Sequence, residues 1–176
     1  MKPIDIPCFI FVGGKSSRFG SAEDDKAALF YKTQYDKCKK VFKNVYFVAK
    51  KRKFKNYPFF IEKSKTYAPF FALEEIVKKH KKVFVLSVDT PLITEKSLIK
   101  TAKSKAVAAD NPLIGYYDYT MLKNFDKKTL KIFGINKRSV KIPKRELVNI
   151  NKTQDLNLLP YKSRKFFKLQ IKRGNA

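Results

Sequence analysis

Residues 8–20 read CFIFVGGKSSRFG, and this stretch decides the fold class expected for the chain. Its first five residues are apolar and rich in β-forming types, which predicts a strand buried on both faces. Gly13 and Gly14 then end the strand. Adjacent glycines let a backbone approach a ligand closely and turn several N–H groups toward an anion. The loop is therefore a candidate phosphate cradle.

Hydroxyl and basic side chains follow the two glycines. Ser16, Ser17 and Arg18 lie in the loop, and Lys26 opens the next helical pattern, so all four offer donors or positive charge to a phosphate. The spacing is neither GxxxxGK[ST] nor GxGxxG. A glycine turn with solvated basic side chains is the alternative interpretation of the loop taken by itself.

Strand and helix patterns alternate along the rest of the chain. Helical spacing covers residues 26–43, 70–79 and 94–104, and apolar runs that indicate strands cover 44–49, 57–62, 82–89, 106–110 and 112–117. A closing helix or loop is expected from residue 157 onward. This alternation predicts an α/β fold, a three-layer α/β/α sandwich around a mostly parallel sheet.

Length and composition favour a single globular domain over residues 1–176. The chain is 44% hydrophobic and 14% aromatic, which is enough for a packed core despite 31% charged residues. The apolar runs are shorter than the roughly 18 residues that cross a bilayer, and no secretory leader opens the sequence. A cytoplasmic protein without membrane attachment is expected.

The formal net charge is +25. Such a charge attracts phosphorylated small molecules, nucleic acid or acidic surfaces without choosing among them. The lysines are spread along the chain, which is typical of solvated faces, and a compositional bias explains them equally well.

Histidine and cysteine chemistry is not expected. Cys8 and Cys38 lack the spacing of a disulfide framework or a zinc site, and His80, the one histidine, is predicted to be a solvated residue at a helix end. Nucleophilic triads and histidine-based metal sites are therefore excluded. A mechanism based on positioning and electrostatics remains.

Asp89 is the second candidate functional feature. It follows the run KVFVLSV and precedes Thr-Pro, so it lies at the carboxyl end of a predicted strand, where parallel sheets bind ligands. Mg²⁺ bound to phosphates needs only one or two protein carboxylates, although an acid here also serves as a turn cap. A phosphate loop and a metal-holding acid together are the minimum set for nucleotidyl transfer, in which a substrate phosphate attacks a nucleoside triphosphate.

Four segments in order resemble the molybdenum cofactor guanylyltransferase family. FVGGKSSRFG with DDKAAL resembles LAGGxSxRMGxDKxxL, SVDTPLI is similar to the metal-binding CDTPF segment, TYAPFFAL to GPLAG, and LVNINKTQDL to FxNxNTPxDL. The resemblance implies a fold of the Rossmann-like nucleotide-diphospho-sugar transferase type. It also implies Mg²⁺-dependent transfer of GMP from GTP to the phosphate of molybdopterin, with release of pyrophosphate.

The resemblance implies specific roles for residues of this chain. Arg18, Lys26 and Asp89 are the expected catalytic residues, with Asp89 as the Mg²⁺ ligand. Glu62 is the candidate acid that contacts guanine, and protein partners are molybdoenzymes or other cofactor-biosynthesis proteins. The residues expected to bind nucleotide or pterin are Val12, Gly13, Gly14, Ser16, Arg18, Lys26, Glu62, Asn149, Asn151 and Asp155.

The chain departs from the family pattern near the base. AKKR, residues 49–52, stands where the family has a guanine-binding asparagine, and Asp24 and Asp25 both match the single acid before Lys26. A cytidylyltransferase of the same fold, acting on molybdopterin or on a sugar or isoprenoid phosphate, is therefore the alternative. A second alternative from another class is an inactive basic protein that binds nucleic acid, with aromatic residues stacking on bases.

Overall fold

The computed structural model describes residues 2–13, 26–66, 68–151, 153–165 and 167. Strand β1 (Cys8–Phe11) is followed by α1 (Lys26–Val41), β2 (Val45–Ala49), β3 (Phe59–Ile61), α2 (Pro69–His80) and β4 (Lys82–Ser87). Then come α3 (Glu95–Lys103), β5 (Val107–Ala108), β6 (Asn111–Asp118) and β7 (Ser139–Val140). The described residues also include three 3₁₀ helices, η1 (Tyr119–Asn124), η2 (Lys144–Glu146) and η3 (Thr153–Leu158), and a helical segment over residues 161–165 follows η3.

The seven strands form one sheet in the order β3-β2-β1-β4-β6-β5-β7. The first four in that order are parallel neighbours, whereas β6 runs antiparallel to both β4 and β5. The sheet is thus mostly parallel, as expected. β6 is the strand that reverses direction. It follows the short β5 directly, without a helical crossover, and such a short connection joins antiparallel neighbours.

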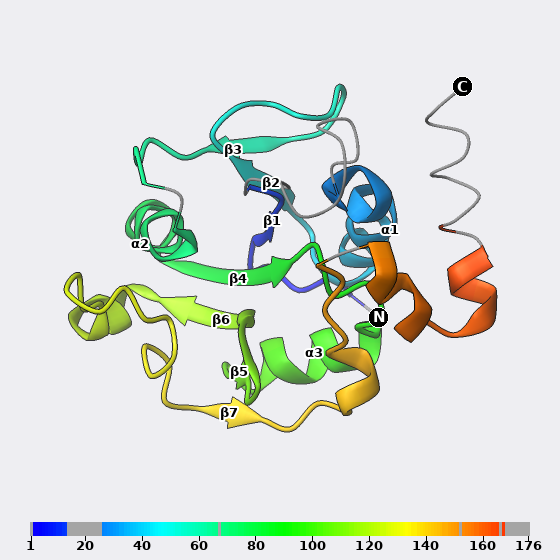
Figure 1. Cartoon of the computed structure of the whole chain (residues 1–176). Coiled ribbons are helices and arrows are strands. Elements are labelled where there is room, and N and C mark those ends of the chain that lie inside the picture. Colours follow the sequence, from blue (N-terminus) through cyan, green and yellow to red (C-terminus); the bar gives the residue numbers. More distant parts are fainter. Residues whose placement is uncertain (1, 14–25, 67, 152, 166, 168–176) are drawn as a thin grey trace.

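Helices cover both faces of the sheet, as Figure 1 shows: α1 and α3 lie on one face and α2 on the other. Alternation along β1 explains this, since Cys8 and Ile10 belong to the core that includes α1 and α3 residues, while Phe9 and Phe11 belong to the core with α2. A strand covered on both sides has no polar face, which is why residues 8–12 are all apolar. The predicted three-layer α/β/α sandwich is confirmed.

The boundaries of the predicted elements lie within two residues of those in the structure. The prediction over 106–110 overestimates β5, which spans only Val107–Ala108, with a register shift between these two residues. The helix predicted from Thr94 is confirmed: Thr94 is its N-cap, and its hydroxyl accepts a hydrogen bond from Ser97 N at 3.2 Å. No helix among the described residues is long and apolar enough to cross a membrane.

His80 corrects the expectation of a solvated side chain. It ends α2 half-buried, with its ring centroid 4.9 Å from that of Phe9 and 6.0 Å from that of Phe60. Burial, followed by the charge of Lys79, lowers its pKa. Its amphipathic ring covers the edge of the core on the α2 side. The lysines next to it in the sequence had indicated an exposed position instead.

Candidate active site

The carboxyl ends of β1 and β4 form the switch point of the sheet. The chain leaves β1 through α1 to reach β2 on one side, and returns through α2 to reach β4 on the other. Right-handed crossovers in opposite directions place α1 and α2 on opposite faces of the sheet, so the direction of winding changes between β1 and β4. Ligands of open α/β sheets bind at such points.

One row of residues crosses this edge of the sheet. Phe11 lies beside Val48 and Ser87 in the strand register, and Ala49 lies beside Ile61. The residues that continue this register beyond the strands lie one position after Ala49 and Ile61 and two positions after Phe11 and Ser87. The row consists of Glu62, Lys50, Gly13 and Asp89.

Asp89 lies two residues beyond β4 and is 8% exposed. The Ser87 hydroxyl donates a hydrogen bond to its Oδ1, and its backbone carbonyl accepts one from Ile150 N at 2.9 Å. Thr90 Oγ1 donates to the Ser87 carbonyl at 3.0 Å, which closes the turn after the strand. The turn presents the carboxylate at the end of β4, where the sequence predicted a metal ligand.

The segment around residue 150 is brought to Asp89 from the far end of the chain. Ile150 is fully buried, and its contact with the Asp89 carbonyl leaves the exposed Asn149 and Asn151 on either side of that contact. Asp155 Oδ2 accepts a hydrogen bond from Asn151 N at 2.8 Å. This hydrogen bond ties Asp155, within η3, to the segment that leads into that helix. The structure therefore brings Asn149 and Asn151 next to the Asp89 backbone, and Asp155 contacts the same segment through Asn151.

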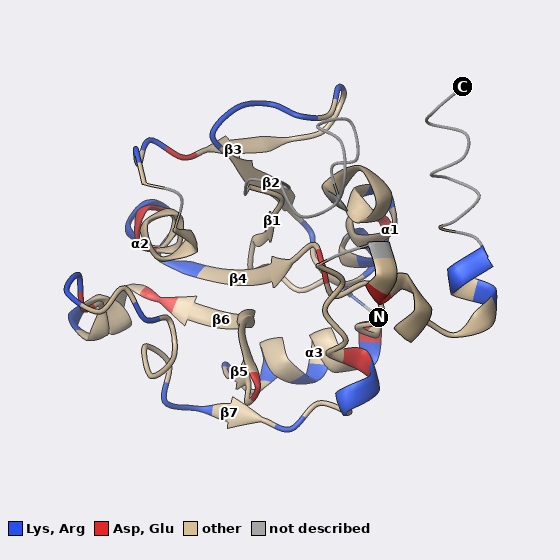
Figure 2. Cartoon of the chain, in the orientation of Figure 1, with Lys and Arg blue, Asp and Glu red and all other residues tan. Residues whose placement is uncertain are grey.

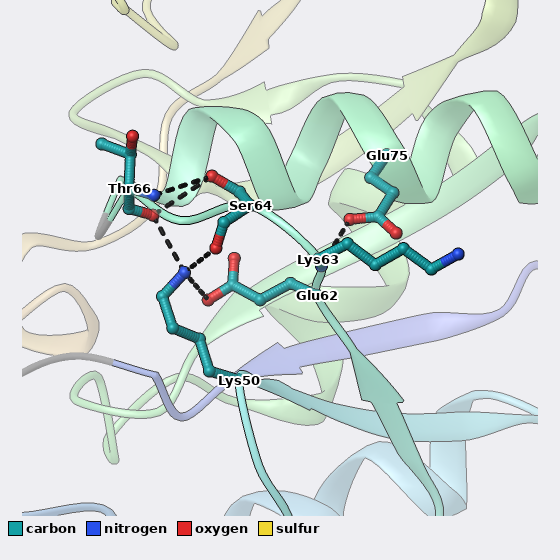
Figure 3. Close-up of polar contacts among 6 residues, drawn as sticks. All are labelled: Lys50, Glu62, Lys63, Ser64, Thr66 and Glu75. Atoms are coloured by element: carbon teal, nitrogen blue, oxygen red, sulfur yellow. Dashed lines mark hydrogen bonds and ion pairs between the residues drawn. The ribbon is translucent and has the colours of Figure 1, made fainter.

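Glu62 and Lys50 form an ion pair, which Figure 3 shows, and Glu62 lies next to Gly13. Lys50 Nζ lies 3.7 Å from Glu62 Oε1, and the two side chains are 23% and 9% exposed. The ammonium also donates hydrogen bonds to the carbonyls of Ser64 and Thr66, the latter at 3.2 Å. Lys50 therefore holds the Glu62 carboxylate and the segment before α2 together.

Burial raises the pKa of Glu62, although the Lys50 ammonium opposes this shift and Glu75 adds to it. Glu75 itself is engaged, because its Oε2 accepts a hydrogen bond from Lys63 N at 3.0 Å. A buried carboxylate with a raised pKa is a typical constituent of a ligand site.

Gly13 leaves room at the centre of the row. A Cβ built on it would lie 3.7 Å from the Val48 carbonyl oxygen and 3.8 Å from Glu62 Oε1, which are ordinary contacts. Val12, by contrast, is 2% exposed and its N–H donates to the Val48 carbonyl at 3.1 Å. Its side chain packs in the core, so only Gly13 of these two presents an open surface.

Several predicted site residues lie outside the described part of the chain. Gly14, Ser16 and Arg18 belong to residues 14–25, as do both candidate acids before Lys26. Lys26 is the first residue of α1, so its position at the helix N-terminus is established while its side chain is not described.

The sequence interpretation missed two polar residues of α1 that contact the Asp89 turn. Gln34 Nε2 donates a hydrogen bond to the Thr90 carbonyl at 2.8 Å, and Lys37 Nζ donates to the Pro91 carbonyl at 2.9 Å. The sequence contains a signal for this. Phe30, Gln34 and Cys38 are spaced four residues apart, so they share the buried face of the helix. A polar residue in an apolar stripe needs a buried partner.

An α/β sheet with a glycine at one strand end and a buried aspartate at the next is an arrangement typical of nucleotide-binding proteins. Comparison with known families identifies the group: residues 8–114 match the MobA-like NTP transferase domain. The chain belongs to this family.

Two curated relatives carry the same name, molybdenum cofactor guanylyltransferase. The protein of Campylobacter jejuni subsp. doylei is 33% identical over an alignment of 192 positions, which covers 96% of this chain and 98% of the relative. That of Campylobacter jejuni strain RM1221 is 36% identical over 155 residues, which cover 74% of this chain and 80% of the relative.

A solved structure has the same fold. The molybdopterin-guanine dinucleotide biosynthesis protein A of Archaeoglobus fulgidus superposes with a TM-score of 0.70 over 92% of this chain and 98% of its own, at 16% identity. The predicted membership of the nucleotide-diphospho-sugar transferase type of fold is thereby confirmed.

Proposed function

We propose that this protein is a molybdenum cofactor guanylyltransferase, which transfers GMP from GTP to the phosphate of molybdopterin and releases pyrophosphate. The observation that carries the proposal is the row of Glu62, Lys50, Gly13 and Asp89 across four parallel strand ends. In this proposal Glu62, held by Lys50, contacts the base, Gly13 leaves room for the phosphates, and Asp89 holds the metal. The family and the names of the relatives support the same activity.

The triphosphate binds over Gly13 in this proposal. The N-terminus of α1 lies at the carboxyl edge of the sheet, because α1 runs back from that edge between two parallel strands. Helix N-termini attract anions through their unpaired N–H groups and dipole. Lys26 begins this helix, and Gly14, Ser16 and Arg18 of the preceding loop complete the predicted cradle.

Asp89 has the chemistry that Mg²⁺ requires. Its carboxylate would supply hard oxygen ligands to the cation at the end of β4. When bound, Mg²⁺ offsets the charge that develops on the α-phosphate and on the leaving pyrophosphate. Asp89 binds and orients it, while the turn after β4 holds the carboxylate in place.

Guanine lies against Glu62. The Watson–Crick edge of guanine presents N1–H and an exocyclic N2 amine beside O6, and a carboxylate accepts hydrogen bonds from the two donors. Lys50, which stands where the family has an asparagine, keeps the carboxylate in position through the ion pair. Cytosine lacks two adjacent donors on this edge, so the acid favours GTP over CTP.

Molybdopterin binds on the side of Asn149, Asn151 and Asp155. The hydrogen bond from Ile150 N to the Asp89 carbonyl brings this segment next to the Asp89 turn, which supports an acceptor site on the metal side of the row. A cytoplasmic location and transfer of the product to a molybdoenzyme or another cofactor-biosynthesis protein stay predictions.

The first experiment compares GTP, CTP, ATP and UTP by thermal shift with Mg²⁺ at low and moderate salt. A ligand that binds only the native state raises the melting temperature. We expect selective stabilisation by GTP that persists at moderate salt. Purified molybdopterin with GTP and Mg²⁺ then gives pyrophosphate, and Asp89→Asn reduces that rate at least 100-fold without lowering the melting temperature by more than a few degrees.

Other outcomes change the proposal. Selective stabilisation by CTP would favour the cytidylyltransferase alternative. If no nucleotide raises the melting temperature but a polynucleotide binds with a steep salt dependence, the basic nucleic-acid-binding alternative replaces the enzyme.

A further inference from the structure

Three consecutive backbone carbonyls after β4 each accept a hydrogen bond from a different place in the chain. The Asp89 carbonyl is bound by Ile150 N at 2.9 Å and the Thr90 carbonyl by Gln34 Nε2 at 2.8 Å. The Pro91 carbonyl is bound by Lys37 Nζ at 2.9 Å. The turn that carries the candidate metal ligand is therefore anchored at three successive peptide groups, two of them through side chains of α1.

The two α1 side chains form a connected unit. Lys37 Nζ also donates to Gln34 Oε1 at 3.0 Å, so each side chain orients the other as well as its own carbonyl. Gln34 is fully buried, and Thr90 is as well. Polar side chains in such a position are costly unless they are satisfied, which means that this arrangement is strongly determined once α1 packs on the sheet.

The position of the Asp89 carboxylate depends on the backbone of this turn. Two side-chain torsions connect the carboxylate to the backbone, and the Ser87 hydroxyl contacts one of its oxygens. A shift of the Thr90 or Pro91 peptide would tilt the Asp89 Cα–Cβ bond and displace the oxygens. Metal affinity is sensitive to such displacement, because groups that orient a ligand typically contribute 10–100-fold.

We propose that Gln34 and Lys37 are positioning residues for nucleotidyl transfer, which hold the Thr90 and Pro91 carbonyls so that Asp89 is fixed for Mg²⁺. The inference rests on the proposed function, since it assigns the metal to Asp89. It adds α1 to the parts of the fold that build the site. It also predicts that the contribution of these side chains appears in metal-dependent binding and not in binding of the nucleotide itself.

The test measures the affinity of the purified protein for GTP by calorimetry, once with Mg²⁺ and once with EDTA, at moderate salt. The ratio of the two dissociation constants reports the gain that the metal provides. The variants are Gln34→Leu, Lys37→Met, which keeps the aliphatic stem, and Asp89→Asn. Asn136→Leu is the matched control, because Asn136 is also a buried amide that donates to two carbonyls, those of Lys105 and Tyr116, at 3.0 and 2.8 Å.

We expect Gln34→Leu and Lys37→Met to reduce the Mg²⁺-dependent gain about tenfold and to leave the affinity in EDTA within twofold of the wild type. Asn136→Leu keeps the full gain even if its melting temperature falls as far. Using two α1 variants guards against one of them failing to fold.

An equal gain in the wild type and in both α1 variants, with the gain lost in Asp89→Asn, would overturn the positioning role alone. A wild-type gain that survives Asp89→Asn, or a wild type that binds no GTP, would contradict the proposed function and the positioning role together.

Discussion

Lys37 is a partly buried ammonium group in the helix beside the candidate site. Burial lowers its pKa to about 8, while Glu95 and Glu146 oppose that shift and Lys40 adds to it. Its hydrogen bonds to the Pro91 carbonyl and to Gln34 are therefore formed by a charged group that the fold holds at a cost.

This cost predicts a pH dependence of stability. Between pH 8 and the unperturbed value of 10.5, the unfolded chain binds a proton on Lys37 that the folded chain has lost. The free energy of unfolding therefore rises with pH in this interval, by up to about 3 kcal/mol from this group. Urea unfolding at pH 7.5 and pH 9.5, compared with Lys37→Met, isolates the effect because other titrations cancel. A free energy of unfolding of the wild type that does not rise relative to that of Lys37→Met between the two pH values would contradict the lowered pKa.

At the scale of elements, β5 and β6 approach each other closely at one glycine. A Cβ on Gly115 would lie 2.4 Å from Val107 Cγ1 and 2.7 Å from Val107 Cα, next to the register shift of β5. Real Cβ atoms do not come so near to a backbone atom. Glycine is needed here for space between two strands, and not for a turn.

Gly115→Ala is therefore expected to lower the free energy of unfolding by about 1–3 kcal/mol, because the strands must separate. Gly13→Ala serves as the control, since its Cβ would make contacts no shorter than 3.7 Å. Urea denaturation of both variants checks the prediction. Equal stability of the two variants would mean that β5 moves away without cost.

The positions of the elements along the chain were largely predictable from the sequence, but the pairing of the strands was not. Apolar runs and helical spacing in the sequence locate β1, β4, α1 and α3 within a few residues. The insertion of β6 between β4 and β5, antiparallel to both, has no local signal. Strand pairing depends on contacts between residues far apart in the sequence, which single-segment patterns do not carry.

At the scale of the whole molecule, the net charge of +25 is spread over many elements, as the blue segments in Figure 2 show. Some acidic side chains form ion pairs with individual lysines, such as Glu95 with Lys40 and Glu74 with Lys78. Repulsion among the remaining lysines disfavours the compact state at low ionic strength.

Added salt is therefore expected to stabilise the protein. The melting temperature should rise by several degrees between about 20 and 300 mM NaCl, because the Debye length falls below typical separations of surface charges. Scanning calorimetry without nucleotide measures this, and KCl should act like NaCl. A melting temperature that stays constant or falls with salt would mean that attractive pairs outweigh the repulsion.

The sequence by itself determined the class of fold, the order of its elements and the two ends of the candidate site, because buried strands, glycine pairs and strand-end acids are local patterns. It also placed Glu62 and the segment around Ile150 in the site, through resemblance to a family. Only the tertiary structure decided which residues meet: Lys50 with Glu62, Ile150 with Asp89, and Gln34 with Thr90. These contacts join segments 12 to 61 residues apart, and they form only when strand register and helix packing bring the segments together.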